Sequence, residues 1–327
     1  MNIVMVIVFH SGIDDLELTI DSIPPKFCEL VVVDVSPTGE AAGLCNDYDF
    51  VSWLSAPRNG GYAWGMNQGV AYALKEFGDS IDVVILSNPD VQYSEFSLRE
   101  LSKVAASSEG ICYPLQVAKS GDLMSHSVLP ALGRAELLSG WLVPFGSSSS
   151  VKQARRTAES AYASSGVVEM PSNTSGSGAC IALSYGAWKT IGGMDERFFL
   201  FSEDRMLTAT AHRQGIVVSV CGNARVVHEG GFKSRGVSML QLSEYIASQR
   251  FAWSALWPAS VALLKVAQVG GLLLRAGRAL PLGDGGKVRM YLRLARLAGS
   301  NKLGIAALTG EDGVRIRVLD RYPEMAR

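Results

Sequence analysis

Short, continuously apolar runs at intervals along the first 90 residues constrain the fold of this chain more than any other feature. Ile3–Phe9, Leu30–Asp34 and Val83–Leu86 are rich in Val and Ile, and Phe50–Leu54 is a weaker run of the same kind. Runs of this length without polar alternation are typical of strands buried on both faces, as in parallel sheets. Tyr62–Phe77, between the last two runs, has the Ala and Leu content of a helix. The alternation predicts an α/β fold with a mainly parallel sheet flanked by helices.

Composition limits the classes of protein to which the chain can belong. The 327 residues are 48% hydrophobic and 19% charged, which is enough to bury one large α/β domain and a smaller appendage. The net charge of −1 offers no electrostatic basis for binding nucleic acid, so we expect no nucleic-acid partner. The five cysteines contain no C-x-x-C pair and are predicted to be buried or incidental thiols in a reducing compartment, which indicates a cytoplasmic protein. The apolar start is too short for a secretion signal or a membrane span.

The chain changes character after residue 115. Periodicity is weak over residues 116–176, and we expect irregular structure on the substrate side there. Order returns with a strand at Ala179–Leu183, a helix at Tyr185–Ile191 and a helix at 203–214, which Ser202 is predicted to cap. Two further short strands are expected at 216–220 and 224–227.

The last 80 residues are predicted to be mostly helical. Phe251–Leu264 carries no charge, and Arg and Lys dominate the charged residues that follow. Pro258, Lys265 and the pair Gly270-Gly271 interrupt the apolar stretch and make it a poor membrane-spanning helix. Two interpretations stay open: the helices pack on the domain, or they form a basic amphipathic surface that rests on anionic lipid. The predicted division is a domain at 1–232, with halves 1–115 and 116–232, and a helical C-terminal region at 233–327.

Acidic residues at strand ends are the first candidates for a functional site. Asp34 and the segment Asn88-Pro89-Asp90 each follow a predicted strand, where open α/β sheets bind ligands. Asp90 can offer one oxygen to Mg²⁺ or Mn²⁺, because these ions keep other positions for water and phosphate oxygens. The alternative for Asn-Pro-Asp is an ordinary turn.

Three other segments can carry chemistry. Glu203-Asp204 follows an aromatic run and is either a favourable acidic helix start or a general base with a raised pKa. His228 is either a metal or diphosphate ligand or a satisfied polar residue. Asn59-Gly60-Gly61 opens a predicted helix, where glycines and the helix N-terminus favour close approach of a phosphate.

The order of these segments resembles the family 2 glycosyltransferases. Asp34 after LVVV, RNGGYAWGMNQG at 58–69 and ILSNPDV at 85–91 resemble the nucleotide-binding half of that family. GSGACIALSYGAWKTIGGMDERFFLFSEDRML at 176–207, followed by His228, is similar to its rhamnosyltransferase-like branch. The resemblance covers 1–232 and implies a GT-A (Rossmann-like) fold, a nucleotide-diphosphate sugar donor, Mg²⁺ or Mn²⁺, and usually inversion of the anomeric centre.

The resemblance also implies roles for single residues. Asp204 matches the catalytic base and Glu203 a residue that orients the site or the acceptor. Asp90 and His228 match the metal ligands. The donor contacts that it implies, to the base, ribose, diphosphate or sugar, are Asp34, Arg58, Asn59, Gly61, Asn88 and Gly178. Two positions depart from the common family pattern: the acid expected after Asp34 in the same loop is absent, and Met206 stands where a further Asp is common.

These matches predict a glycosyltransferase of cell-surface polysaccharide synthesis. The resemblance favours dTDP-L-rhamnose as donor, then UDP-sugars, with a glycan or polyprenyl-linked hydroxyl as acceptor and a peripheral contact with the cytoplasmic membrane. Whether the chain is a monomer or a homodimer stays open. Two alternatives remain: a sugar nucleotidyltransferase, although the loop His10–Asp14 lacks the basic residues expected of one, and an inactive glycan-binding protein of the same fold.

Overall fold

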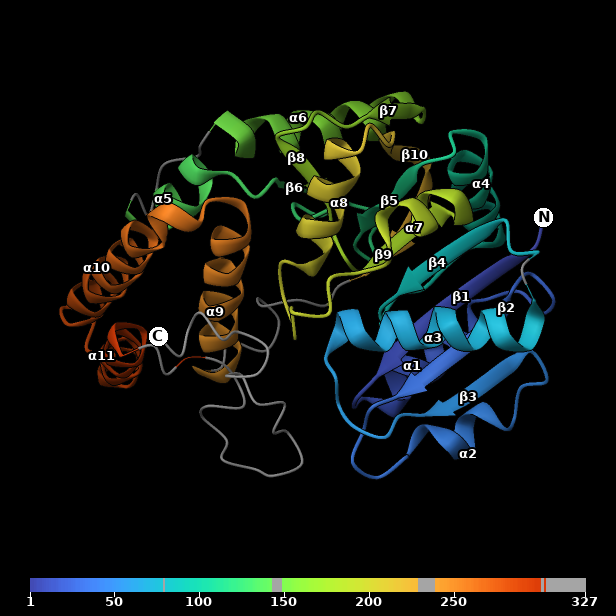
Figure 1. Ribbon diagram of the computed structural model, residues 1–327, viewed down its shortest axis with the longest axis horizontal. Coiled ribbons are helices and arrows are strands. Elements are labelled where there is room, and N and C mark those ends of the chain that lie inside the picture. The colour runs from blue at the N-terminus through green and yellow to red at the C-terminus, as the bar shows by residue number, and fades with distance from the viewer. Residues whose placement is uncertain (79, 143–148, 229–238, 301–302, 304–327) are drawn as a thin grey trace.

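One large sheet dominates the computed structural model, which describes residues 1–78, 80–142, 149–228, 239–300 and 303 (Figure 1). Its strand order is β3-β2-β1-β4-β9-β5-β10-β7. The bounds are β1 (Ile3–Phe9), β2 (Glu29–Asp34), β3 (Val51–Ser55), β4 (Val83–Ser87), β5 (Ile111–Val117), β7 (Val167–Glu169), β9 (Cys180–Ser184) and β10 (Val218–Val227). The strands β6 (Val128–Pro130) and β8 (Thr174–Gly176) form a separate antiparallel pair.

Helices cover both faces of the large sheet. The helices on one face are α3 (Tyr62–Phe77), α6 (Ser149–Ser164), α7 (Tyr185–Ile191) and α8 (Glu203–Arg213), and those on the other are α1 (Ile13–Asp21), α2 (Ala41–Cys45) and α4 (Glu95–Ser107). Strand β1 shows why its sequence is apolar without alternation. Val4, Val6 and Val8 enter the core under α3, while Met5 and Ile7 enter the opposite core. Burial on both faces is the condition that the Val/Ile runs predicted.

The predicted α/β class and the mainly parallel sheet are confirmed. Parallel pairing joins β1 to β2 and β4, β2 to β3, and β5 to β10. Antiparallel pairing occurs in the middle of the sheet, where β9 runs antiparallel to both β4 and β5, and at one edge, where β7 runs antiparallel to β10. The predicted helices Tyr62–Phe77 and Tyr185–Ile191 are present with those bounds. All five cysteines are free thiols and buried, which is one of the two predicted alternatives.

Three local predictions were wrong. Residues 116–176 are more regular than expected, because α5 (Arg134–Leu142), α6 and strands β6, β7 and β8 lie among them. The two strands expected at 216–220 and 224–227 are one strand, β10, whose register shifts between Cys221 and Arg225. Ser202 does not cap α8: its backbone is left-handed, with φ of 67°, and its side chain makes no capping hydrogen bond in the described structure.

The C-terminal helices build a third core against α5 and the first turns of α8. They are α9 (Met239–Leu256), α10 (Val261–Ala279) and α11 (Gly285–Gly299), with a short 3₁₀ turn at Pro258–Ser260 between the first two. Phe198 and Met206 from the sheet side share this core with Trp253. Buried Arg250 ties the three helices together, since it donates to Gln268 Oε1 on α10 and to the carbonyl oxygen of Ala298 on α11. Packing on the domain, one of the two predicted interpretations, is therefore observed for one side of these helices.

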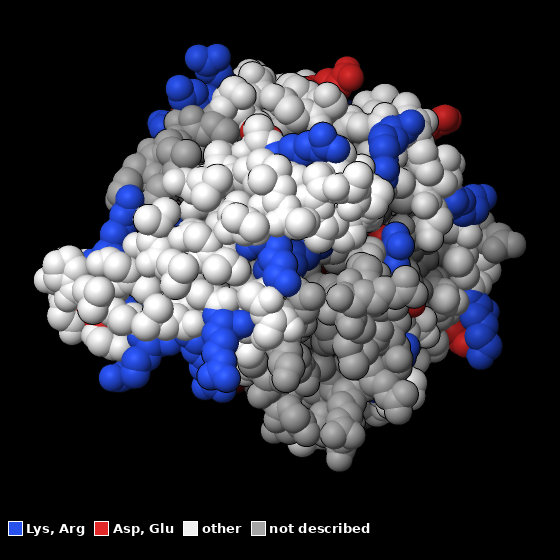
Figure 2. All heavy atoms as spheres, turned by 60° about the vertical axis from the view of Figure 1, so that its left-hand side comes forward, with Lys and Arg blue, Asp and Glu red and all other residues white. Residues whose placement is uncertain are grey.

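The other side of α10 is exposed. In the described part of the chain, Pro258–Ala279 is the one helical segment long and apolar enough to cross a membrane, and a third of its apolar window is buried. The large exposed apolar side chains of this region are Leu263, Val266, Leu273, Leu274, Leu280, Leu282 and Leu292. Figure 2 shows the side of the molecule that includes these helices, with a broad surface free of charge, blue side chains at its borders and few red ones.

Candidate functional site

The candidate site lies where β4 and β10 end at their carboxyl edge and β9 begins. Asn88 follows β4, and its N–H donates to the carbonyl oxygen of Ala179, just before β9 (2.8 Å). On the other flank, Gln92 and Val227 form an antiparallel bridge with two backbone hydrogen bonds. That bridge brings the turn after β4 beside the end of β10, so that Asp90 faces His228 across 138 positions of sequence. Ligand binding at this edge is the general rule for open α/β sheets.

The turn that carries Asp90 is held from below by Thr19 of α1. The Thr19 hydroxyl donates to the carbonyl oxygen of Pro89 (2.8 Å) and accepts from the N–H of Val91 (3.1 Å). Thr19 is fully buried, so both bonds are shielded from water. Thr19 thus fixes the backbone groups on both sides of Asp90, whose half-buried carboxylate lies beside the His228 ring.

Asp90 and His228 form a pair suited to a divalent cation. Asp90 Oδ1 lies 3.3 Å from His228 Nε2. The other ring nitrogen, Nδ1, lies 2.9 Å from Oε1 of buried Gln116. A carbonyl oxygen accepts hydrogen bonds only, so in the neutral imidazole Gln116 favours the tautomer with its proton on Nδ1, whose Nε2 lone pair can bind a cation beside Asp90. The ring of His126 packs edge-on against His228, with centroids 5.7 Å apart.

The donor set fits Mg²⁺ or Mn²⁺ better than a closed structural metal. No group of three or more His, Cys, Asp or Glu side chains that could hold a metal gathers within the described ranges. One carboxylate and one imidazole leave most coordination positions for water and for oxygens of a bound diphosphate, which is the usual arrangement for these cations at phosphate-handling sites. Orientation of the imidazole by a second hydrogen bond, as by Gln116, is typical of metal-ligating histidines.

The candidate base Asp204 lies at the first turn of α8. Its Oδ2 accepts the N–H of Gly178 (2.8 Å), and its Oδ1 accepts the N–H of Arg205 (2.7 Å). A Cβ at position 178 would lie 3.0 Å from Asp204 Cβ, so only glycine permits this approach without displacement. Packing against Asp204 is therefore a reason for glycine at position 178. The contact of Gly178 with the donor sugar is a separate prediction.

Glu203 and Asp204 are different in their surroundings. Glu203 is buried, and its Oε2 has no hydrogen-bond partner among the described residues. Burial raises the pKa of Glu203 well above its usual range, and the charge of Asp204 raises it further. Desolvation also raises the pKa of Asp204, while the Arg205 guanidinium and the backbone N–H groups of Arg205 and Gly178 oppose that rise. The charged form is therefore stabilised more by hydrogen bonds and by Arg205 at Asp204 than at Glu203, although burial raises the pKa of both groups.

The backbone directly before this pair is strained. Phe201 and Ser202 both have left-handed conformations, with φ of 70° and 67°, which non-glycine residues seldom adopt. Such strain costs about 1–3 kcal/mol per residue and is concentrated at functional sites. Here it turns the chain from the aromatic run into α8, so that the first turn of that helix faces Gly178.

Tyr62 lies between the two halves of the site. Its hydroxyl donates to the carbonyl oxygen of Gly178 (2.8 Å). Burial raises the pKa of Tyr62 well above its usual range, and the charges of Glu203, Asp204 and Asp90 all raise it as well. The N–H of Gly178 donates to Asp204, and the carbonyl of the next residue, Ala179, accepts from Asn88, so hydrogen bonds link the predicted base to the turn that carries the predicted metal ligand.

Three further predicted donor contacts lie at the end of β2 and in the segment before α3. Asp34 is buried, and its carboxylate accepts from the N–H of Ser36 and Ala41 and from the Trp53 indole, so it organises its own loop. Exposed Arg58 lies over the ring of Trp64, with 5.4 Å from its guanidinium carbon to the ring centroid. Asn59 Oδ1 accepts the N–H of Gly61. Donor contacts by these residues stay predictions.

Gly61 at the start of α3 is required by packing. Its φ is 85°, and a Cβ there would lie 2.3 Å from the carbonyl oxygen of Phe199. The same carbonyl accepts the N–H of Tyr62 (2.8 Å). The glycine thus lets the aromatic segment before Asp204 cross directly over the helix start, and a contact of Gly61 with a donor phosphate stays a prediction.

Sequence reasoning missed Gln116, Tyr62 and Thr19. Gln116 stands inside an apolar strand, where a buried amide needs a partner, and that was the signal that could have singled it out. Thr19 and Tyr62 have ordinary helical surroundings in sequence, and their roles follow from contacts with residues 70 or more positions away.

Comparison with known proteins supports the fold assignment. No protein-family profile matches the chain. The chain is 24% identical over 207 residues to the low-salt glycan biosynthesis hexosyltransferase Agl10 of Haloferax volcanii. This match covers 61% of the chain and 58% of the hexosyltransferase, so it spans just over half of that relative.

Two solved structures resemble the whole described fold. GalNAc-T7 with UDP, GalNAc and Mn²⁺ matches with a TM-score of 0.54 at 15% identity, over 99% of this chain and 58% of that one. The mannosyltransferase PcManGT of Pyrobaculum calidifontis, in complex with GDP-Man and Mn²⁺, matches with a TM-score of 0.53 at 13% identity, over 95% and 88%. Both neighbours are glycosyltransferases whose crystals hold Mn²⁺. The predicted architecture is confirmed: this chain has the mixed, mostly parallel α/β fold of GT-A glycosyltransferases.

Proposed function

We propose that the protein is a metal-dependent, inverting glycosyltransferase that moves a sugar from a nucleotide diphosphate to an acceptor hydroxyl. The single observation that carries the proposal is the convergence of two elements on one sheet edge: the pair Asp90–His228, and an Asp204 held by Gly178 beside Tyr62. The glycan-pathway hexosyltransferase relative and the Mn²⁺-containing neighbours support the same reaction class.

In the proposed reaction Asp204 takes the proton of the acceptor hydroxyl. The acceptor oxygen then forms a bond to the anomeric carbon, while the bond from that carbon to the diphosphate oxygen breaks and its electron pair leaves with the nucleoside diphosphate. Attack opposite the leaving group inverts the anomeric centre. The raised pKa of Asp204 makes it a stronger base than an ordinary aspartate.

Asp90 Oδ1 and His228 Nε2 would hold the divalent cation. When bound, the cation stabilises the negative charge that develops on the departing diphosphate. Gln116 fixes the imidazole, and Thr19 fixes the turn that carries Asp90, so both ligands are in place before the donor arrives.

The donor and the acceptor are finer parts of the proposal. We take dTDP-L-rhamnose as the first donor to test, on the likeness of 176–207 to the rhamnosyltransferase-like branch. UDP-GalNAc and GDP-mannose follow, because the neighbours were crystallised with UDP and GalNAc or with GDP-Man. The acceptor is a glycan or a lipid-linked sugar at the cytoplasmic face of the membrane, in synthesis of a surface polysaccharide. The exposed apolar face of α10 supports that location.

Replacing the base separates chemistry from donor binding. Asp204→Asn is isosteric and keeps an acceptor for the Gly178 N–H, so it should bind nucleotide and Mn²⁺ as the wild type does and lose sugar transfer by about 10²–10⁴-fold. The measurement is release of nucleoside diphosphate over a panel of nucleotide sugars, with thermal stabilisation by each nucleotide as the binding readout. Asp90→Ala should lose both activity and Mn²⁺-dependent stabilisation. Wild-type turnover by Asp204→Asn would contradict the proposed role.

A further inference from the structure

The aromatic segment that precedes α8 lies along one face of α9. Tyr245, Ser248 and Phe251 are spaced by three residues, so they lie on the same side of that helix. The Phe251 ring packs edge-on against Phe198, with ring centroids 4.7 Å apart. Nearly two turns earlier in the helix, Tyr245 meets Phe201 in the same geometry at 6.0 Å. The segment therefore runs antiparallel to α9, and Ser248 lies between the two aromatic contacts.

Ser248 binds the backbone of that segment. Its side chain is fully buried, and its hydroxyl donates to the carbonyl oxygen of Leu200 (2.7 Å). Removing this donor would leave the carbonyl oxygen without that partner in a packed interface, which is costly. Leu200 is followed directly by Phe201 and Ser202, the two residues with left-handed backbone. Ser248 thus fixes the chain at the residue before the strained turn.

The same segment is also held by α3. The N–H of Tyr62, at the start of α3, donates to the carbonyl oxygen of Phe199 (2.8 Å). Further along α3, the Asn67 amide donates to the carbonyl oxygen of Met194 and accepts its N–H, both at 2.9 Å. The neighbouring carbonyls of Phe199 and Leu200 are thus fixed to two different helices. A strained turn persists only where the surrounding contacts determine its conformation, and α3 and α9 together provide those contacts.

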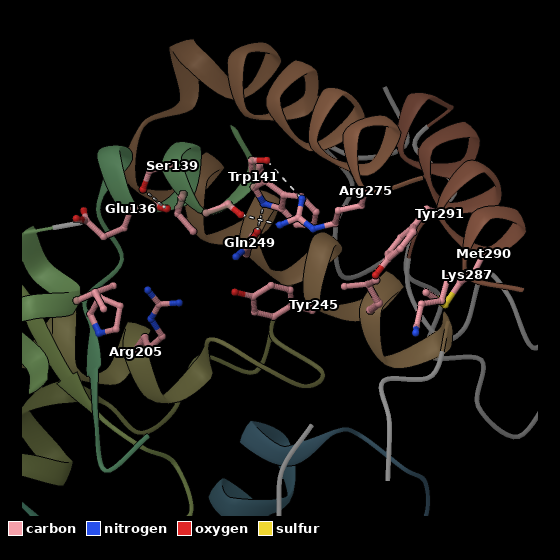
Figure 3. Close-up of a pocket in the computed structure, with 15 residues that line it drawn as sticks. Glu136, Ser139, Trp141, Arg205, Tyr245, Gln249, Arg275, Lys287, Met290 and Tyr291 are labelled. Atoms are coloured by element: carbon pink, nitrogen blue, oxygen red, sulfur yellow. Dashed lines mark hydrogen bonds between the residues drawn. The ribbon is translucent and has the colours of Figure 1, made fainter. Parts of the chain in front are cut away.

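The strained turn fixes where α8 begins. The carbonyl oxygen of Ser202 accepts the N–H of Met206 (2.9 Å), which closes the first turn of that helix. Asp204 lies within this turn, so a shift of Ser202 moves the carboxylate of the proposed base. Tyr245 and Arg205 both line a cavity of about 530 Å³, and the hydroxyl end of Tyr245 points toward Arg205 (Figure 3). This face of α9 therefore lies beside the first turn of α8 as well as beside the segment before it.

We propose that Ser248 is a positioning residue for sugar transfer, which holds the Leu200 carbonyl so that the strained turn presents Asp204 to the acceptor hydroxyl. The inference rests on the proposed function, since Ser248 acts through the proposed base. Displacement of a reacting group by about 1 Å can lower a rate about 100-fold, so one hydrogen bond can matter without touching the substrate. The proposal makes α9 part of the catalytic apparatus, although the sequence predicts residues 233–327 to lie outside the glycosyltransferase domain.

Two alanine variants of α9 test the position of the base. The assay is release of nucleoside diphosphate, with water as acceptor, from whichever of dTDP-L-rhamnose, UDP-GalNAc and GDP-mannose the wild type turns over fastest with Mn²⁺. Ser248→Ala should lower kcat at least about tenfold and leave the KM for that donor within about twofold. Ser254→Ala is the matched control and should keep the wild-type kcat, because its hydroxyl donates to the carbonyl oxygen of Arg250 within α9 itself. Equal kcat in the two variants would overturn the inference.

A double variant tests whether Ser248 acts through Asp204. In the Asp204→Asn background the base is already lost, so adding Ser248→Ala should change the residual rate by less than about twofold. A further loss of about tenfold in this background would show that Ser248 serves another step, and the proposed role would be wrong. A melting temperature lowered in Ser248→Ala while kcat stays at the wild-type value would show that the bond serves stability alone, which also contradicts the proposal.

Ser248→Cys replaces the alanine variant if Ser248→Ala does not fold. It has nearly the same size and a weaker donor, so its kcat should fall by at least about twofold, and a wild-type kcat would reject the role of the hydroxyl. Failure of the two proposals can be told apart. Turnover that is lost in Asp204→Asn and unchanged in the Ser248 variants contradicts this inference alone. If the wild type turns over none of the three donors, the proposed function fails and this inference fails with it.

Discussion

At the scale of single residues, Gln116 decides which nitrogen of His228 faces Asp90. Gln116→Leu removes the acceptor for the Nδ1 proton, so the imidazole can rotate or change tautomer. We expect the affinity for Mn²⁺ to fall about 10–100-fold, which is typical for loss of a hydrogen bond to a metal ligand. Titration of Mn²⁺ followed by electron paramagnetic resonance measures it.

Two control variants distinguish a loss of His228 orientation from a general loss of structure. Gln116→Glu keeps an oxygen acceptor and should retain most of the affinity for Mn²⁺. Gln214→Leu, on an exposed side chain at the end of α8, should match the wild type. Equal Mn²⁺ affinity in Gln116→Leu and the wild type would mean that the imidazole is oriented by other contacts.

Glu203 should make stability depend on pH. Its pKa is raised in the folded protein, so it stabilises the fold below the ordinary glutamate pKa of about 4.3, and that contribution is lost as pH rises toward the raised value. Glu203→Gln has no proton to lose. Its melting temperature should exceed that of the wild type by a margin that grows from pH 5 to pH 8, by about 2–4 °C for each kcal/mol gained.

The comparison needs an exposed carboxylate as control. Glu40→Gln changes the same charge at the protein surface and should follow the wild type at every pH. The melting temperatures are measured by differential scanning calorimetry at each pH. A constant difference between Glu203→Gln and the wild type from pH 5 to pH 8 would show that Glu203 ionises as an exposed acid does.

At the scale of elements, α3 lies so close to the sheet that its glycines have no room for a side chain. A Cβ at Gly69 would lie 2.2 Å from Val6 Cγ1 and 2.9 Å from Val33 Cγ2, and both valines are stiff and buried. Gly69→Ala should therefore cost about 1–3 kcal/mol of unfolding free energy, as overpacking of a core does. Urea denaturation measures this loss.

Gly270 in α10 provides the control for Gly69, because it is also a glycine within a helix. A Cβ there meets nothing within 4 Å, so Gly270→Ala should keep or raise stability by up to about 1 kcal/mol through helix propensity alone. A loss of the same size in both variants would show that the contact of α3 with the sheet adjusts freely.

At the scale of the whole molecule, charge and exposed apolar surface are both gathered in the C-terminal helices. Between residues 239 and 300 the only acids are Glu244 and Asp284, against Arg250, Lys265, Arg275, Arg278, Lys287, Arg289, Arg293 and Arg296. The net charge of the full chain is nevertheless −1. We expect this end of the molecule (Figure 2) to bind vesicles that contain an anionic phospholipid, and to release them as ionic strength rises.

Flotation with vesicles of phosphatidylcholine, with and without phosphatidylglycerol, measures that binding on the full chain. Leu280 and Leu282 are 65% and 80% exposed in the turn between α10 and α11, and their double replacement by Ser should lower binding at least about tenfold. Leu18→Ser with Val217→Ser changes two exposed apolar residues elsewhere and should have no effect. Flotation that is absent in the wild type, or insensitive to both double variants, would contradict the membrane contact.

The amino-acid sequence by itself determined the elements whose signals are local. The Val/Ile runs predicted β1, β2 and β4, and the composition of 62–77 predicted α3, because burial on both faces or on one helical face leaves a mark in neighbouring residues. The same signals placed Asp90 and Asp204 at element ends. Only the tertiary structure decided that Asp90 faces His228 through the bridge of Gln92 with Val227, that Gln116 orients the imidazole, and that Ser202 is strained and does not cap α8. These features depend on contacts between residues far apart in the chain, and neither apolar periodicity nor helix-capping preference carries information about such pairs.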